Sequence, residues 1–187
     1  MTEEINMIID MARESMSSSI EHLSAELTKI RAGKANPSML DSVSVDYYGS
    51  KTPLSQVANV NTLDARTLSI QPWEKAMLEE IEKAITNSNL GLNPQNNGEL
   101  IMINVPQLTE ERRRELVKQA KAAGEHDKVS IRNARKDAND EIKKMSNDGL
   151  PEDLGKGAEA SVQKVTDEYT KKIDDLVAAK EADIMTV

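Results

Sequence analysis

The chain has 187 residues, of which 30% are charged and 38% hydrophobic, and its formal net charge is −8. Aromatic residues make up only 2%, which argues against an all-β core, and the absence of cysteine excludes a disulfide scaffold, a thiol nucleophile and cysteine-based metal centres. No apolar run reaches the roughly 18 residues that a membrane-spanning helix needs. The acidic first ten residues also lack the pattern of a secretory signal, so we expect a soluble, cytoplasmic protein.

Residues 3–30 predict one long helix. Apolar side chains recur every three or four residues from Ile5 to Ile30, and no glycine or proline interrupts them. At ~1.5 Å per residue this helix is about 40 Å long. One such helix cannot cover its own apolar stripe, so it needs partner helices of similar length.

Residues 32–105 change character. Gly33 and Pro37 end the helix, and from Leu40 apolar and polar residues alternate through Tyr47, which predicts a half-buried strand. We then expect a turn over 48–53, short strands over 56–61 and 67–71, a helix over 73–87 with Trp73 on its packed side, a polar loop over 87–98 and a strand over 100–105. These elements predict a small α/β domain inserted between long helices.

Two more long helices follow the insert. The first begins after the N-cap candidate Thr109 and runs to about Met145, and the second runs from about Ala158 to Ile184. Gly124, in mid-helix, indicates either a close helix approach or a bend. The α+β fold we expect is therefore a three-helix bundle of residues 1–31 and 106–187, with a domain of residues 32–105 inserted. Two crossings, at Arg31–Gly33 and Val105–Gln107, would permit hinge bending.

Basic residues are concentrated in one stretch. Residues 109–145 contain 11 Lys and Arg against 8 Asp and Glu, so they carry +3 and the remainder carries −11. Helical spacing aligns six of these residues into a basic stripe: Arg114, Lys118, Lys121, Lys128, Arg132 and Arg135. The stripe could neutralise phosphates of a nucleic acid, although an ordinary solvated helix face is the alternative interpretation.

The sequence offers no recognisable catalytic or metal-binding motif. The two histidines, His22 and His126, each stand alone on a predicted helix. The Gly33-Lys34 and Gly155-Lys156 pairs lack the context of a phosphate-binding loop. We therefore expect no enzymatic activity, no metal and no cofactor.

Several segments resemble a known family. Leu108–Arg113 and Val129–Asp140 closely resemble signature segments of the bacterial ribosome recycling factor family. Similar matches occur in residues 30–35, 45–49, 52–54, 82–85, 90–94, 162–167 and 171–174. The resemblance thus extends over essentially the whole chain, in order.

The resemblance implies an L-shaped translation factor with a three-helix bundle and a β/α/β domain. It implies that the protein acts with elongation factor G and GTP, binds large-subunit rRNA and splits the subunits of the ribosome after termination. The rRNA-binding residues we expect are Arg113, Arg132 and Arg135 from the resemblance, with Arg114 and Lys128 added from the basic stripe. The hinge residues we expect are Arg31, Ala32, Gly33, Val105 and Pro106. We expect a monomer without a membrane partner.

A different class of protein remains open at this point. An acidic helical-bundle adaptor or co-chaperone, which binds other proteins through its grooves, would explain the net charge of −8. It would not explain why the arginines are segregated.

Overall fold

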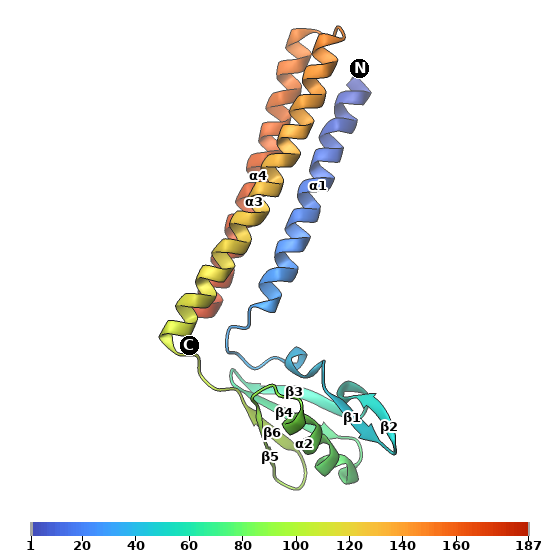
Figure 1. The fold of residues 1–187 in the computed structure, drawn as a ribbon, viewed down its shortest axis with the longest axis vertical. Coiled ribbons are helices and arrows are strands. Elements are labelled where there is room, and N and C mark those ends of the chain that lie inside the picture. Colours follow the sequence, from blue (N-terminus) through green and yellow to red (C-terminus); the bar gives the residue numbers. More distant parts are fainter. Residues whose placement is uncertain (1, 187) are drawn as a thin grey trace. The chain divides into compact units, whose positions relative to one another are not determined.

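The computed structural model describes residues 2–186. The chain divides into two compact units, one formed by the residues up to Ala32 together with those from Glu110, and the other by Gly33–Thr109. The first unit consists of three long helices that lie side by side: α1 (Thr2–Lys29), α3 (Glu110–Asn147) and α4 (Glu152–Met185) (Figure 1). The second is a small sheet unit with one α-helix. The predicted α+β class, long helices plus a small sheet domain, is confirmed.

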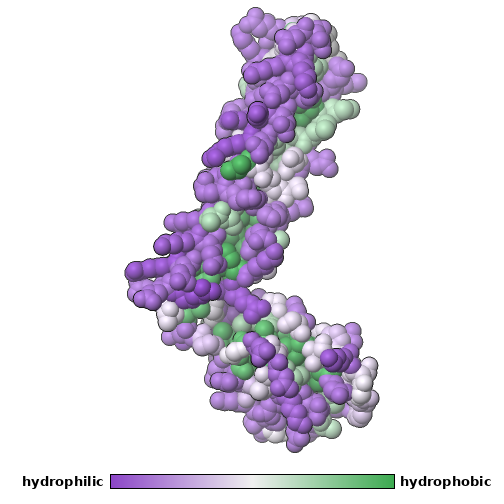
Figure 2. Space-filling model, viewed as in Figure 1, coloured by the Kyte–Doolittle hydropathy of each residue, from purple (hydrophilic) through white to green (hydrophobic). Residues whose placement is uncertain are grey.

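Each long helix buries one apolar stripe against the other two. On α1 the buried side chains are Ile5, Ala12, Met16, Leu23 and Leu27. The buried stripe of α3 begins at Leu116 and contains one acidic residue, Asp127. Hydrophilic residues cover most of the visible face of these helices, and hydrophobic residues show only in narrow strips and small patches (Figure 2).

Gly124 marks a close approach of α3 to α4. A Cβ atom at this position would lie 2.6 Å from Cγ2 of Val177, which is far inside van der Waals contact. Of the two interpretations that the sequence left open, the structure thus shows the close approach. The missing side chain lets the two helix backbones come together at this level.

The small unit contains two antiparallel sheets. Strands β1 (Ser44–Tyr47) and β2 (Ser50–Pro53) form a hairpin. The second sheet has the order β3-β4-β6-β5, with strands Ala58–Asp64, Thr67–Pro72, Ile101–Asn104 and Asn93–Asn96 in that order. Helix α2 (Leu78–Asn87) contributes Leu78, Ile81 and Ile85 to the same core as the apolar residues of β4 and β6. Short 3₁₀ turns occupy Pro37–Leu40, Leu54–Gln56 and Lys75–Met77.

Three local predictions in this unit are wrong. The expected turn over 48–53 contains strand β2, and the expected polar loop over 87–98 contains strand β5. Trp73 does not lie on a packed helix face: its side chain is 64% exposed, and the α-helix begins only at Leu78. The reason is that the backbone N–H of Trp73 donates to the carbonyl of Val57, so the extended pairing of β3 and β4 continues past Pro72.

Within residues 2–186, we find no helix with both the length and the apolar character needed to cross a membrane.

Candidate nucleic-acid interface

The basic stripe of α3 lies along the side of that helix that borders α4. Arg114, Lys118, Lys121 and Arg132 are exposed, whereas Lys128 and Arg135 are half-buried. The half-buried members contact side chains of α4, namely Asp174 and Gln163. The stripe is therefore accessible along most of its length, as the sequence predicted, but its members differ in what they contact.

Three members of the stripe are already neutralised by carboxylates of the protein. Arg114 pairs with Glu110 one turn earlier. Lys121 Nζ lies 3.4 Å from Oε1 of Glu181. Lys128 Nζ lies 2.6 Å from Oδ1 of Asp174 and 3.2 Å from Oε1 of Glu125. The hydrogen bond with Asp174, more than that with Glu125, raises the pKa of Lys128 above its usual value.

The three arginines that the family resemblance singled out have no carboxylate partner within the described part of the chain. Arg113 donates from Nη1 to the backbone carbonyl of Met185 at 3.4 Å, and Arg135 donates from Nη1 to Oε1 of Gln163 at 3.3 Å. Arg132 is exposed and forms no side-chain hydrogen bond or ion pair with residues 2–186. We call Arg113, Arg132 and Arg135 the uncompensated arginines, because two of them have only neutral partners and Arg132 has none among residues 2–186, so each guanidinium charge can bind an external anion.

Residues 30–36 and 105–109 connect the two units and have no regular secondary structure. The backbone N–H of Ala35 donates to the carbonyl of Ala65 at 2.9 Å, and that of Val105 donates to the carbonyl of Arg66 at 2.7 Å. Val105 of the second crossing, and Ala35 two residues after the first, are therefore both hydrogen-bonded to the turn between β3 and β4. Gly33 has a φ of +72°, a conformation that glycine adopts without strain. Of the five expected hinge residues, Val105 is the one held by both burial and a backbone hydrogen bond.

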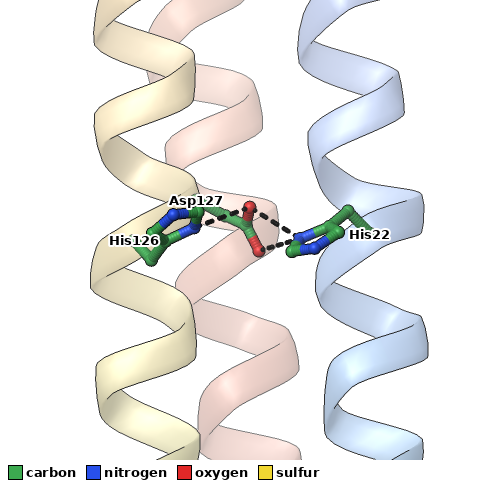
Figure 3. Close-up of side chains that lie close together, drawn as sticks. All are labelled: His22, His126 and Asp127. Atoms are coloured by element: carbon green, nitrogen blue, oxygen red, sulfur yellow. Dashed lines mark hydrogen bonds and ion pairs between the residues drawn. The ribbon is translucent and has the colours of Figure 1, made fainter.

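Each histidine stands alone on its own helix and is exposed, but the two lie close together, which the sequence did not indicate. Their ring centroids lie 6.1 Å apart, and Asp127 lies between them (Figure 3). Nδ1 of His22 is 3.0 Å from Oδ1 of Asp127, and Nδ1 of His126 is 3.6 Å from the same oxygen. His22 comes from α1 and the other two residues from α3, and Asp127 lies 105 positions after His22, so sequence spacing could not reveal the cluster.

A second cluster that sequence reasoning missed lies in the small unit. The hydroxyl groups of Tyr47 and Tyr48 donate to the two carboxylate oxygens of Glu74, at 3.0 and 2.8 Å. Their rings meet edge to face with centroids 4.7 Å apart. The hydrogen bond to Glu74, and then its negative charge, raise the pKa of both tyrosines. The only sequence signal was the pair of adjacent tyrosines itself.

A comparison with protein families gives a decisive match. The model of the ribosome recycling factor family matches residues 23–185. The chain belongs to the ribosome recycling factor family. The resemblance noted in the sequence is thereby confirmed.

Full-length relatives support the assignment to this family. The chain is 59% identical to the ribosome-recycling factor of Flavobacterium psychrophilum over 187 residues, which cover 100% of both chains. It is 55% identical to that of Porphyromonas gingivalis over 185 residues, which cover 98% of this chain and 100% of the relative. These are translation factors, so the protein is placed among factors of protein synthesis.

Solved structures of family members share the fold. A solution structure of the ribosome recycling factor matches with a TM-score of 0.73 and 36% identity, over 98% of both chains. A structure of the T. thermophilus factor and E. coli elongation factor G bound to the E. coli post-termination complex matches with a TM-score of 0.62 and 44% identity, over 97% of this chain and 99% of that one.

Proposed function

We propose that this protein, together with elongation factor G and GTP, disassembles the ribosome that remains on mRNA after termination. It binds rRNA of the large subunit, splits the subunits and so releases the ribosome from the mRNA. Membership of the ribosome recycling factor family supports this proposal, as does the T. thermophilus relative bound with elongation factor G to a post-termination complex. The protein acts as a monomer in the cytoplasm, where ribosomes are found.

The uncompensated arginines are the observation that supports the proposal of rRNA binding. A guanidinium that already holds a carboxylate must break that ion pair before it can bind a phosphate, whereas an uncompensated one only releases counterions from the RNA. Arg113, Arg132 and Arg135 therefore supply the main phosphate contacts. Arg114 and Lys128 add weaker ones, because Glu110 and Asp174 compete for them.

The small unit changes its orientation relative to the helices during subunit splitting. Bending takes place at Arg31, Ala32, Gly33 and Pro106, and Val105 is the fixed end of the second crossing because its N–H is bonded to Arg66. Two covalent crossings permit a directed swing and prevent free rotation, and the fixed φ of Pro106 narrows the range further. Binding to rRNA needs only the helices, whereas splitting needs this movement.

The protein itself performs no catalysis. The chemical step of the cycle is GTP hydrolysis, and elongation factor G carries it out. This protein contributes the free energy of binding to the ribosome and the movement of its small unit. It follows that the purified protein hydrolyses no nucleotide.

A light-scattering assay of subunit splitting tests the proposal. Post-termination 70S ribosomes should dissociate only when the protein, elongation factor G and GTP are all present. The double variant Arg132→Ala/Arg135→Ala should slow dissociation by more than about tenfold, because two phosphate contacts are lost. Arg112→Ala is the matched control, since this arginine of α3 already pairs with Glu115 at 2.8 Å.

Two results would contradict the proposal. One is dissociation at the normal rate by the double variant, provided that circular dichroism shows a native helix content; an adaptor that binds proteins would then fit better. The other is GTP hydrolysis by the purified protein without elongation factor G.

The hinge has its own test, because the chain contains no cysteine and a single engineered pair can form only one disulfide. With one cysteine in each unit, the oxidised protein should still bind ribosomes but should not split them. Reduction of the same sample is the matched control and should restore splitting. Normal splitting by the oxidised protein would mean that the factor acts as a rigid wedge.

A further inference from the structure

The cluster of His22, His126 and Asp127 has no part in the function proposed above. It joins two helices, with His22 on α1 and the other two residues on α3 (Figure 3). The two imidazoles are largely exposed, at 53% and 74% of their side-chain surface, whereas the side chain of Asp127 is only 3% exposed. A carboxylate held at the floor of the cluster thus faces two imidazoles at the surface.

The distances within the cluster suit a single tetrahedral ion. One ligand atom from each residue can be chosen so that all three lie within 4.8 Å of one another. Zn²⁺ binds nitrogen and oxygen ligands at about 2.0–2.2 Å, which places neighbouring ligand atoms of a tetrahedron about 3.3 Å apart. The two Nδ1–Oδ1 separations, 3.0 and 3.6 Å, lie on either side of this value. The ligand nitrogens of the two imidazoles lie within 4.8 Å of each other, and rotation of these exposed rings would bring them to the tetrahedral spacing.

We propose that His22, His126 and Asp127 form a binding site for a divalent transition-metal ion, with Zn²⁺ the best match. Two neutral imidazoles and one carboxylate are typical ligands of Zn²⁺, and a water from the exposed side completes the fourth position. Mg²⁺ and Ca²⁺ are poorly matched because they prefer oxygen ligands.

One further carboxylate, that of Glu26, lies near the site, and it is already paired with a lysine. Glu26 lies one turn along α1 from His22, and its pKa is lowered, chiefly by the hydrogen bond and charge of Lys29 and to a smaller extent by the two imidazoles. This carboxylate is therefore close enough to interact with the cluster electrostatically. Its ion pair with Nζ of Lys29, at 2.5 Å, offsets this charge, so binding of an ion depends on the three ligand residues themselves.

A bound ion would join the last third of α1 to the middle of α3. Because an ion that binds only the folded state shifts the unfolding equilibrium, Zn²⁺ should raise the melting temperature of the protein in a concentration-dependent way. This effect does not depend on ribosomes. The metal-binding proposal can therefore be tested separately from the function proposed above.

Isothermal titration calorimetry and thermal unfolding with Zn²⁺, on protein purified without a histidine tag, test the site. The wild type should bind one Zn²⁺, and its melting temperature should rise. His22→Gln and His126→Gln should each weaken binding by more than about tenfold and abolish the thermal shift, while both remain folded because both side chains lie at the surface. Mg²⁺ should have no effect.

Glu125→Gln is the matched control, because this exposed carboxylate neighbours His126 in sequence but pairs with Lys128. It should bind Zn²⁺ like the wild type. With Co²⁺ as the probe, the wild type should show the visible absorption of a four-coordinate ion, and the histidine variants should not. The proposal is overturned if the wild type binds no Zn²⁺, if either histidine can be replaced without loss, or if Glu125→Gln weakens binding as much as the histidine variants do.

Discussion

Arg132 and Lys128 lie one turn apart on α3 and carry the same charge, but their surroundings differ. The side chain of Lys128 is 19% exposed and is held by Asp174 and Glu125, whereas that of Arg132 extends from the surface without a partner in residues 2–186. Two residues of one stripe therefore have different roles. Lys128 contributes mainly to packing of α3 against α4, and Arg132 is available to an external phosphate.

The tyrosine pair of the small unit gives a prediction on pH dependence. Glu74 raises the pKa of Tyr47 and Tyr48 above the ordinary 10.0 in the folded state. The stabilisation from these two hydrogen bonds is thus fully present below the ordinary pKa and is lost as the pH rises through the raised pKa. Glu74→Ala should return both titrations towards 10.0, as measured by NMR of the tyrosine rings.

Glu99→Ala is a suitable control for this titration, because Glu99 is an exposed glutamate of the same unit. It should leave both tyrosines unchanged. Raised pKa values that persist in Glu74→Ala would show that another group is responsible.

At the level of elements, the contact between α3 and α4 gives a prediction on stability. Replacing a helical glycine by alanine usually gains up to about 1 kcal/mol. At Gly124 the new methyl group would lie 2.6 Å from the stiff, β-branched Val177, and overpacking of this kind costs about 1–3 kcal/mol. We therefore expect Gly124→Ala to lower the free energy of unfolding by about 1 kcal/mol in urea denaturation.

The chain provides a matched control in the helix Glu152–Met185. A Cβ atom at Gly157 would have no neighbour within 4 Å, so Gly157→Ala should gain about 0.5–1 kcal/mol. Adding Val177→Ala to Gly124→Ala should relieve the clash. If Gly124→Ala is as stable as Gly157→Ala, the close approach does not constrain the bundle.

Elements differ in how well the sequence predicted them, and the reason is periodicity. The long helices repeat their apolar residues over many turns, so their existence and their pairing were predictable. Strands β2 and β5 are four residues each and carry Ser, Lys, Asn, Gln and Pro, so no apolar alternation marks them. They form through pairing with β1 and β6, which is a tertiary effect that a local pattern does not contain.

At the scale of the whole molecule, contacts between different helices were also not predictable from the sequence of the candidate site. Helical spacing predicted the basic stripe, because all its members are on one helix. It did not predict which members are neutralised, since Asp174 and Glu181 come from α4. The histidine cluster was missed for the same reason, because it forms only when α1 packs on α3.

The charge distribution of the whole molecule favours contact with RNA through one region, helix α3. The chain carries −8 overall, while residues 109–145 carry +3. The negative remainder should be repelled by RNA, so that the helix α3 is presented to it. The affinity for RNA should therefore fall as salt is added. Only a few basic residues should account for this salt dependence.

The measurement that tests the central claim most directly is binding to isolated large ribosomal subunits across a salt series. The slope of log K against log salt should fall by about one unit in magnitude for each of Arg132→Ala and Arg135→Ala, and by about two in the double variant. Arg112→Ala should leave the slope unchanged. A wild-type slope in a correctly folded double variant would contradict the account, because the uncompensated arginines would then not contact phosphates.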